Sequence, residues 1–196
     1  MEEFFGNVLN LSDPELIRSL CEISDTVKME KGTVIIRQEE RLNAVMLVLK
    51  GIYRGYYLDA EGKEITDCFG LSIGEPVIPC SLFNEPSEIT IECIAEGSCL
   101  RIDLAGLTAL VRRKSWHAEL LECYNRFLIQ GIKRHQRHKR VIHDCDAVGR
   151  YRWFLREYPG LIDVISHKDI ASFIGMTPVT LSKLRGKLRA KEVVNA

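Results

Sequence analysis

The stretch from Ser166 to Leu188 carries polar and basic residues at spacings that suit contact with a nucleic acid. Ser166 and Thr177 can each cap the start of a helix, and Pro178 follows at a first helical position, where its missing N–H costs nothing. Gly175 interrupts the helical spacing of the apolar residues, so the stretch predicts two short amphipathic helices joined by a turn. This is the pattern of a helix-turn-helix unit, and the alternative is an ordinary helical hairpin.

The second predicted helix turns polar and basic side chains away from its apolar positions. In a helix-turn-helix unit this helix enters the major groove, where short polar side chains read base edges and basic side chains reach guanine or phosphate. We expect near the bases Thr177, Pro178, Thr180, Ser182 and Lys183, and near the phosphates Ser166, His167, Lys168, Arg185 and Lys187. The alternative is a solvated basic face that needs no partner.

Charge is divided unevenly along the chain, although the formal net charge of the 196 residues is zero. Residues 1–110 hold 9 Lys and Arg against 19 Asp and Glu, whereas residues 111–196 hold 18 against 8. An acidic N-terminal part and a basic C-terminal part indicate two functions in one chain, and only the basic part suits a polyanion.

The acidic N-terminal part has the pattern of a small antiparallel β-structure. The capping signal at residues 12–16 predicts one helix over Leu9–Lys28. Turn signals then separate short runs with a period of two residues, which predict strands at residues 33–37, 44–50, 52–58, 64–69, 89–94 and 98–103. Six closely spaced strands indicate an antiparallel β-roll, like a jelly roll.

The β-roll is followed by a short predicted helix over residues 104–114 and a long one over residues 115–143. The long helix carries an apolar stripe of Leu121, Tyr124, Leu128 and Ile132, which favours pairing with a second copy as a two-stranded coil. The alternative is packing on its own roll. Its basic later part, residues 132–140, either approaches DNA or is solvated.

Catalytic and metal sites find little support in the sequence, and we expect no enzyme and no metal. A metal-dependent enzyme built on a jelly roll needs histidines inside the barrel, but the first histidine is His117, after the roll. The seven cysteines include no C-x-x-C pair and mostly have apolar neighbours, which predicts that they are core residues. A thiol switch is the alternative. Only Cys21 lies among the first 67 residues, which disfavours an N-terminal iron–sulfur cluster.

The order of acidic roll, long helix and basic helix-turn-helix resembles the Crp/Fnr family of bacterial transcription regulators. The likeness rests on residues 31–40 (KGTVIIRQEE), residues 47–64 (LVLKGIYRGYYLDAEGKE), Gly74-Glu75 and the helix-turn-helix. The resemblance implies a homodimer on a two-fold symmetric double-stranded DNA operator, with RNA polymerase as a further candidate partner. Cyclic-AMP regulators carry Arg-Glu and a later Arg in the recognition helix; Pro178, Val179 and Lys183 stand there, so we expect a different operator.

The effector pocket implied by the resemblance would include Gly74, Glu75, Pro76, Ser87 and Glu88. Cyclic-nucleotide binders of the family place an arginine where Ser87 stands, and a buried phosphate needs such a charge-assisted donor. Glu88 beside it would repel a phosphate, so we expect no cyclic AMP in the usual mode. The pocket is then empty, shaped for a different ligand, or filled by side chains such as Leu82 and Phe83.

We therefore expect an α+β chain with three parts. These are a β-roll sensor over residues 1–114, a dimerisation helix over residues 115–143, and a winged-helix-like helix-turn-helix domain with a truncated wing over residues 144–196. No apolar run is long enough for a membrane span, and the start Met-Glu-Glu is unlike a signal peptide, so we expect a cytoplasmic protein. A helix-turn-helix that contacts another protein instead of DNA stays open.

Overall fold

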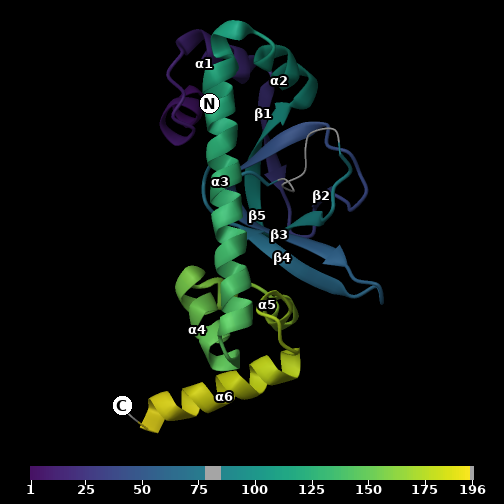
Figure 1. The fold of residues 1–196 in the computed structure, drawn as a ribbon, viewed down its shortest axis with the longest axis vertical. Coiled ribbons are helices and arrows are strands. Elements are labelled where there is room, and N and C mark those ends of the chain that lie inside the picture. Colours follow the sequence, from purple (N-terminus) through teal and green to yellow (C-terminus); the bar gives the residue numbers. More distant parts are fainter. Residues whose placement is uncertain (78–84, 195–196) are drawn as a thin grey trace. The chain divides into compact units, whose positions relative to one another are not determined.

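The computed structural model describes residues 1–77 and 85–194, which divide into two compact units (Figure 1). The first unit comprises residues 1–57 and 69–132, and the second comprises residues 58–68 and 133–196. The roll and the N-terminal helices lie in the first unit. The basic C-terminal helices lie in the second, together with the tip of a β-hairpin.

The first part of the chain folds as an antiparallel β-roll with helices. Its elements are η1 (Phe4–Val8, a π-helix), α1 (Pro14–Glu22), β1 (Ser24–Met29), β2 (Val34–Ile36), β3 (Ala44–Leu58), β4 (Glu64–Gly70), β5 (Thr90–Asp103) and α2 (Leu104–Val111). In the described residues the strands form one sheet in the order β1-β5-β3-β4, with β2 paired to β5. The α+β fold class and the β-roll are therefore confirmed.

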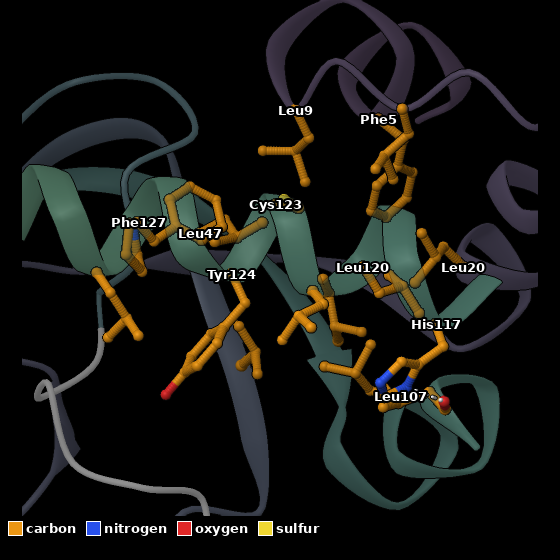
Figure 2. Close-up of a pocket in the computed structure, with 17 residues that line it drawn as sticks. Phe5, Leu9, Leu20, Leu47, Leu107, His117, Leu120, Cys123, Tyr124 and Phe127 are labelled. Atoms are coloured by element: carbon orange, nitrogen blue, oxygen red, sulfur yellow. Dashed lines mark hydrogen bonds between the residues drawn. The ribbon is translucent and has the colours of Figure 1, made fainter. Parts of the chain in front are cut away.

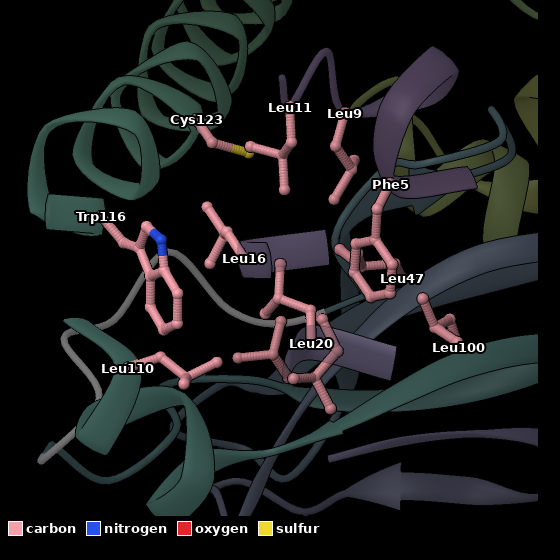
Figure 3. Packing of buried hydrophobic residues seen from close by; sticks show 12 residues of the cluster. Phe5, Leu9, Leu11, Leu16, Leu20, Leu47, Leu100, Leu110, Trp116 and Cys123 are labelled. Atoms are coloured by element: carbon pink, nitrogen blue, oxygen red, sulfur yellow. The ribbon is translucent and has the colours of Figure 1, made fainter. Parts of the chain in front are cut away.

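Strand β3 is buried on both faces, and its period of two divides its side chains between two cores. Val45 and Leu47 join the cluster formed with the N-terminal helices, α2 and α3, which Figure 3 shows. Met46 and Val48 point the other way, into a cluster inside the roll. This alternation explains why residues 44–48 are apolar without interruption.

Two pairs of predicted strands are single long strands in the structure. Residues 44–50 and 52–58 lie in β3, and residues 90–94 and 98–103 lie in β5, which begins at Thr90, one residue after the predicted start. The pairing register between β3 and β5 shifts around Lys50–Tyr53, where Gly51 has a φ of 105° and a Cβ would lie 2.9 Å from the Cα of Gly97. The two glycines thus mark a bulge between paired strands rather than a turn.

The predicted helix over Leu9–Lys28 is wrong at both ends. The helix α1 begins at Pro14, capped by Asp13, whose Oδ1 accepts from the N–H groups of Glu15 and Leu16. Residues 24–29 form β1 instead, pairing with residues 97–102 of β5. The long-range pairing overrides a local spacing that predicts a helix.

The long helix α3 (Lys114–Asp144) matches the predicted range within one residue at each end and is shared by the two units. After it come α4 (Ala147–Glu157), η2 (Leu161–Asp163, a 3₁₀ turn), α5 (His167–Phe173) and α6 (Pro178–Val194). The helix α6 extends beyond the predicted end and is helical through Val194. No helix in the described part of the chain is long and apolar enough to cross a membrane.

Candidate nucleic-acid interface

The helices α5 and α6 form a helix-turn-helix pair whose two starts are capped by the predicted residues. Ser166 Oγ accepts from the N–H of Asp169 at 3.1 Å, and Thr177 Oγ1 accepts from the N–H of Thr180 at 3.1 Å. Pro178 is the first residue of α6. Between the helices Gly175 has a φ of 62°, a left-handed conformation that favours glycine.

The pair is held together by apolar residues spaced for the crossing of two helices. Ile170, Ala171, Ile174 and Leu181 are all fully buried. The small side chain of Ala171 lets the helices approach closely, and Leu181 anchors α6 against α5. With this anchor buried, the opposite face of α6 is left to solvent.

The exposed face of α6 holds most of the predicted DNA-contacting residues. Thr177, Pro178, Thr180, Ser182, Lys183 and Lys187 are all exposed. Val179 beside them is 63% exposed, so an apolar side chain also faces solvent here and offers a contact for a thymine methyl group. Its place on the side of the second helix away from the apolar positions predicts this exposure, although Val179 was not among the expected base-contacting residues.

The predicted phosphate-contacting residues of α5 lie at its start and are partly engaged. His167 and Lys168 are exposed; the ring of His167 contacts the guanidinium of Arg185 on α6. Lys168 Nζ lies 3.7 Å from Glu64 Oε2, a weak surface ion pair. The helices α5 and α6 thus both contribute basic side chains to the second unit, and one of them, Lys168, has an acidic neighbour within ion-pair distance.

The tip of the β3–β4 hairpin contacts α5 within the second unit. The backbone N–H of Thr66 donates to Ser172 Oγ at 2.9 Å, and that hydroxyl lies 3.5 Å from the carbonyl oxygen of Glu64. The sequence did not indicate this contact. It joins residues more than 100 positions apart, and both partners are ordinary polar residues.

A stacked aromatic cluster supports the helix-turn-helix from the side of α3. The His138 ring packs against both Trp153 and Phe173, with centroids 5.6 Å and 4.2 Å away, and these two rings are themselves 6.0 Å apart. Its Nε2 is 2.8 Å from the carbonyl oxygen of Phe173, which can only accept, so this nitrogen carries the proton. Burial lowers the pKa of His138, while the Phe173 hydrogen bond and Asp67 oppose the shift. The histidine is a neutral structural group.

Two of the predicted effector residues, Gly74 and Glu75, lie in a tight turn, and Ser87 is buried elsewhere in the roll. Glu75 Oε2 accepts from the N–H groups of Leu71 and Ser72 at 3.0 and 3.1 Å, and Gly74 has a φ of 81°. Ser87 is 1% exposed, and its hydroxyl donates to the carbonyl of Ile89.

The other two predicted effector residues differ in exposure. Glu88 is exposed, whereas Pro76 is half-buried and pairs with Leu47 in an isolated bridge. Leu82 and Phe83 lie outside the described residues.

Arg54 is a buried cation inside the roll that the sequence analysis did not single out. It is 3% exposed, its Nη1 lies 3.0 Å from Glu92 Oε1, and its guanidinium stacks over the Tyr56 ring at 4.4 Å. Arg54 and Glu92 are cross-strand partners in β3 and β5. In the predicted strands at residues 52–58 and 89–94, Arg54 and Glu92 are the only charged residues. This was the signal that could have paired them.

The cysteines of the roll are protonated structural residues. Cys93 and Cys99 are fully buried, and burial raises the pKa of Cys93 and that of Cys99 to about 11. Burial also raises the pKa of Cys123. Because the thiolate is the reactive form, these three thiols are poorly suited to redox chemistry. Cys80 lies outside the described residues.

The predicted dimerisation residues form a partly exposed apolar stripe on the part of α3 that lies in the first unit. Leu121 is 45% exposed and Ile132 is 55% exposed, while Tyr124 and Leu128 are half-buried. Ile129 beside them is 51% exposed. Exposed apolar residues in a row along one helix are typical of an interface.

The roll, the long helix and the helix-turn-helix define the class of fold: a β-roll domain followed along the chain by a long helix and a helix-turn-helix pair. Residues 26–114 match the family model of the cyclic nucleotide-binding domain. The chain has the fold of Crp/Fnr-family transcription regulators. Among curated proteins, none matches the chain significantly in sequence.

Three solved structures illustrate this likeness. FixK2 from Bradyrhizobium japonicum is 20% identical with a TM-score of 0.72, over 87% of this chain and 86% of that one. The c-di-GMP responsive global regulator CLP from Xanthomonas campestris is 15% identical with a TM-score of 0.71, over 92% and 93%. A protein described as a Crp/Fnr-family regulator from Eubacterium rectale is 18% identical with a TM-score of 0.75, over 96% and 88%.

Proposed function

We propose that the chain is a homodimeric, sequence-specific DNA-binding transcription regulator of the Crp/Fnr type. The observation that carries the proposal is the face of α6. Polar and basic side chains around Thr180 and Lys183 are exposed on it, while Leu181 between them is fully buried against α5. A capped helix with its anchor buried and its polar face open has the form that enters a major groove. RNA polymerase is then a candidate partner.

The dimer is supported by the periodicity of the α3 stripe. Leu121, Leu128 and Ile132 follow a spacing of seven and four residues, which is that of a two-stranded coil. Asn125 is exposed and falls between them at the next seam position, where a buried asparagine specifies parallel pairing. A parallel pair of α3 helices would give two recognition helices related by a two-fold axis.

Independence from cyclic AMP is part of the proposal. Ser87 stands where a phosphate-binding arginine is expected, and its hydroxyl is already bonded to Ile89. Arg54, a buried cation of the roll, already forms an ion pair with Glu92. A buried phosphate without a cation would be costly, so cyclic AMP would bind weakly. A different small ligand remains the second candidate for the effector, and the cavity described below favours it over thiol oxidation.

The test is binding of the purified, reduced chain to duplex DNA at several salt concentrations, with and without cyclic AMP. We expect the affinity to fall steeply with salt, because phosphate contacts release counterions, and to be unchanged by cyclic AMP. A helix-turn-helix that contacts only proteins would show no DNA binding at low salt. A large increase in affinity with cyclic AMP would contradict the effector part of the proposal alone.

A further inference from the structure

An apolar cavity of about 190 Å³ is lined by residues of the first unit. Its walls come from the N-terminal segment, strands β3 and β5, helix α2 and the first half of α3, as Figure 2 shows. Of the predicted effector residues only Pro76 lines it, and Gly74, Glu75, Ser87 and Glu88 do not. It is therefore a separate site from the expected nucleotide pocket.

Part of the wall of this cavity belongs to the core, and part of it, including His117 and Leu121, is exposed. Phe5, Leu20 and Leu47 all line it and are no more than 1% exposed. Protein interiors are close-packed, and an unfilled space of this size leaves its lining without contacts.

The chemistry of the lining selects an uncharged ligand. No lysine, arginine, aspartate or glutamate lines the cavity. Its polar groups are the Tyr124 hydroxyl, the Cys123 thiol and the His117 ring, whose Nδ1 lies 3.1 Å from the Val111 carbonyl oxygen. A carboxylate or phosphate inside would lack a cation, whereas one neutral polar group could be accommodated.

We propose that this cavity binds a small uncharged hydrophobic compound of the size of an indole or an alkylbenzene. Apolar cavities of about 150 Å³ stay dry and bind benzene, so the larger space here suits about eight to twelve non-hydrogen atoms. Hydrophobic ligands of this kind fill the space without adding charge to the core.

A ligand in this cavity contacts the helix that carries the proposed dimer interface. Leu121, Tyr124 and Leu128 line the cavity and also belong to the predicted dimerisation stripe. Occupancy therefore changes the self-association of the chain, a consequence that rests on the proposed dimer. By thermodynamic linkage, dimerisation would then also change the affinity for the ligand, whereas the binding requires no DNA.

The test is calorimetric titration of the full chain, without DNA, with indole and with n-butylbenzene. We expect saturable binding with a Kd below about 1 mM and a raised Tm, because small ligands of this size bind efficiently in enclosed apolar sites. Leu107→Trp places a larger side chain in the cavity and should weaken binding at least about tenfold.

Leu104→Trp is the matched control, because Leu104 is also half-buried on α2 but does not line the cavity. It should leave the Kd within about twofold. If Leu107→Trp fails to fold, Leu107→Ala replaces it; the enlarged cavity should then favour a naphthalene over indole relative to the wild type.

No binding of either probe by the wild type would overturn the proposal. So would equal binding by the wild type and the Leu107 variants, which would place the probes on the surface. Both results would leave the proposed DNA binding untouched, since no DNA is present.

Discussion

At the scale of single residues, two lysines on α6 can distinguish sequence-specific contacts with DNA bases from electrostatic attraction to any DNA. Lys183 and Lys187 are both exposed and lie one helical turn apart, but only Lys183 is within the N-terminal part of α6 that is expected near the bases. They therefore serve as matched probes of the recognition helix.

We expect Lys183→Ala to lower the preference for the operator over other DNA by about tenfold. Lys187→Ala should weaken binding to all sequences alike and reduce the slope of affinity against salt by about one. Competition binding over a range of salt concentrations measures both quantities. An equal, sequence-independent loss in the two variants would contradict this division of roles.

His138 gives a pH dependence to the stability of the second unit. Its pKa in the folded chain lies below the ordinary value, chiefly because of burial, so the unfolded chain binds its proton more tightly. Stability is thus complete above the ordinary histidine pKa of about 6.5 and decreases as the pH falls through and below it. Asp67 and His135 also act on this ring, in opposite directions.

We expect the free energy of unfolding to be lower at pH 5.5 than at pH 7.5, and His138→Phe to reduce that difference. Phenylalanine keeps the stack with Trp153 and Phe173 but has no titratable nitrogen. Urea unfolding at the two pH values measures the effect, with the exposed His143→Phe as control. A pH dependence unchanged by His138→Phe would show that another group controls it.

At the scale of elements, the helix caps were predictable because they depend on local sequence. Ser166 and Thr177 cap α5 and α6 as their positions before apolar runs predict. Residues 24–29 were misassigned because β1 exists only through pairing with β5, and nothing local ends the helical spacing at Ile23. The contact between Thr66 and Ser172 was hidden for the same reason, since it is long-range and polar.

We expect Ser166→Ala to lower the free energy of unfolding of the second unit by about 1 kcal/mol, because the N–H of Asp169 loses its acceptor. Ser182→Ala is the control: this exposed serine lies inside α6 and should change stability by less than about 0.5 kcal/mol. Urea unfolding followed by helix circular dichroism compares the two. Equal effects would contradict the capping role.

The exposed stripe of α3 makes a prediction for the proposed dimer. Ile132 is 55% exposed and does not line the cavity, so Ile132→Glu should disturb pairing without disturbing the core. We expect the variant to be monomeric at protein concentrations at which the wild type is dimeric, because two buried carboxylates would face each other. Sedimentation velocity measures this.

Gln130→Glu adds the same charge at an exposed position on another face of α3 and should leave the dimer intact. A wild-type monomer at high concentration, or a dimer that survives Ile132→Glu, would contradict the stripe as the interface.

At the scale of the whole molecule, the uneven distribution of charge along the sequence agrees with the division of the chain into two compact units. The acidic N-terminal part folds as the roll, and the basic helices lie in the second unit. The hairpin tip at residues 58–68 also belongs to the second unit, which no composition change along the chain could indicate. The cavity of the first unit likewise could not be predicted, because its walls come from segments that lie far apart in the sequence and meet only in the folded chain.

The central claim is that a dimer of this chain reads DNA sequence through α6. The most direct test is selection of bound duplexes from a random DNA pool by the reduced protein, with no ligand added. We predict a two-fold symmetric motif whose half-site centres lie about 10 base pairs, or about 34 Å, apart. Recovery of no DNA at low salt, or of DNA without any common motif, would contradict the claim.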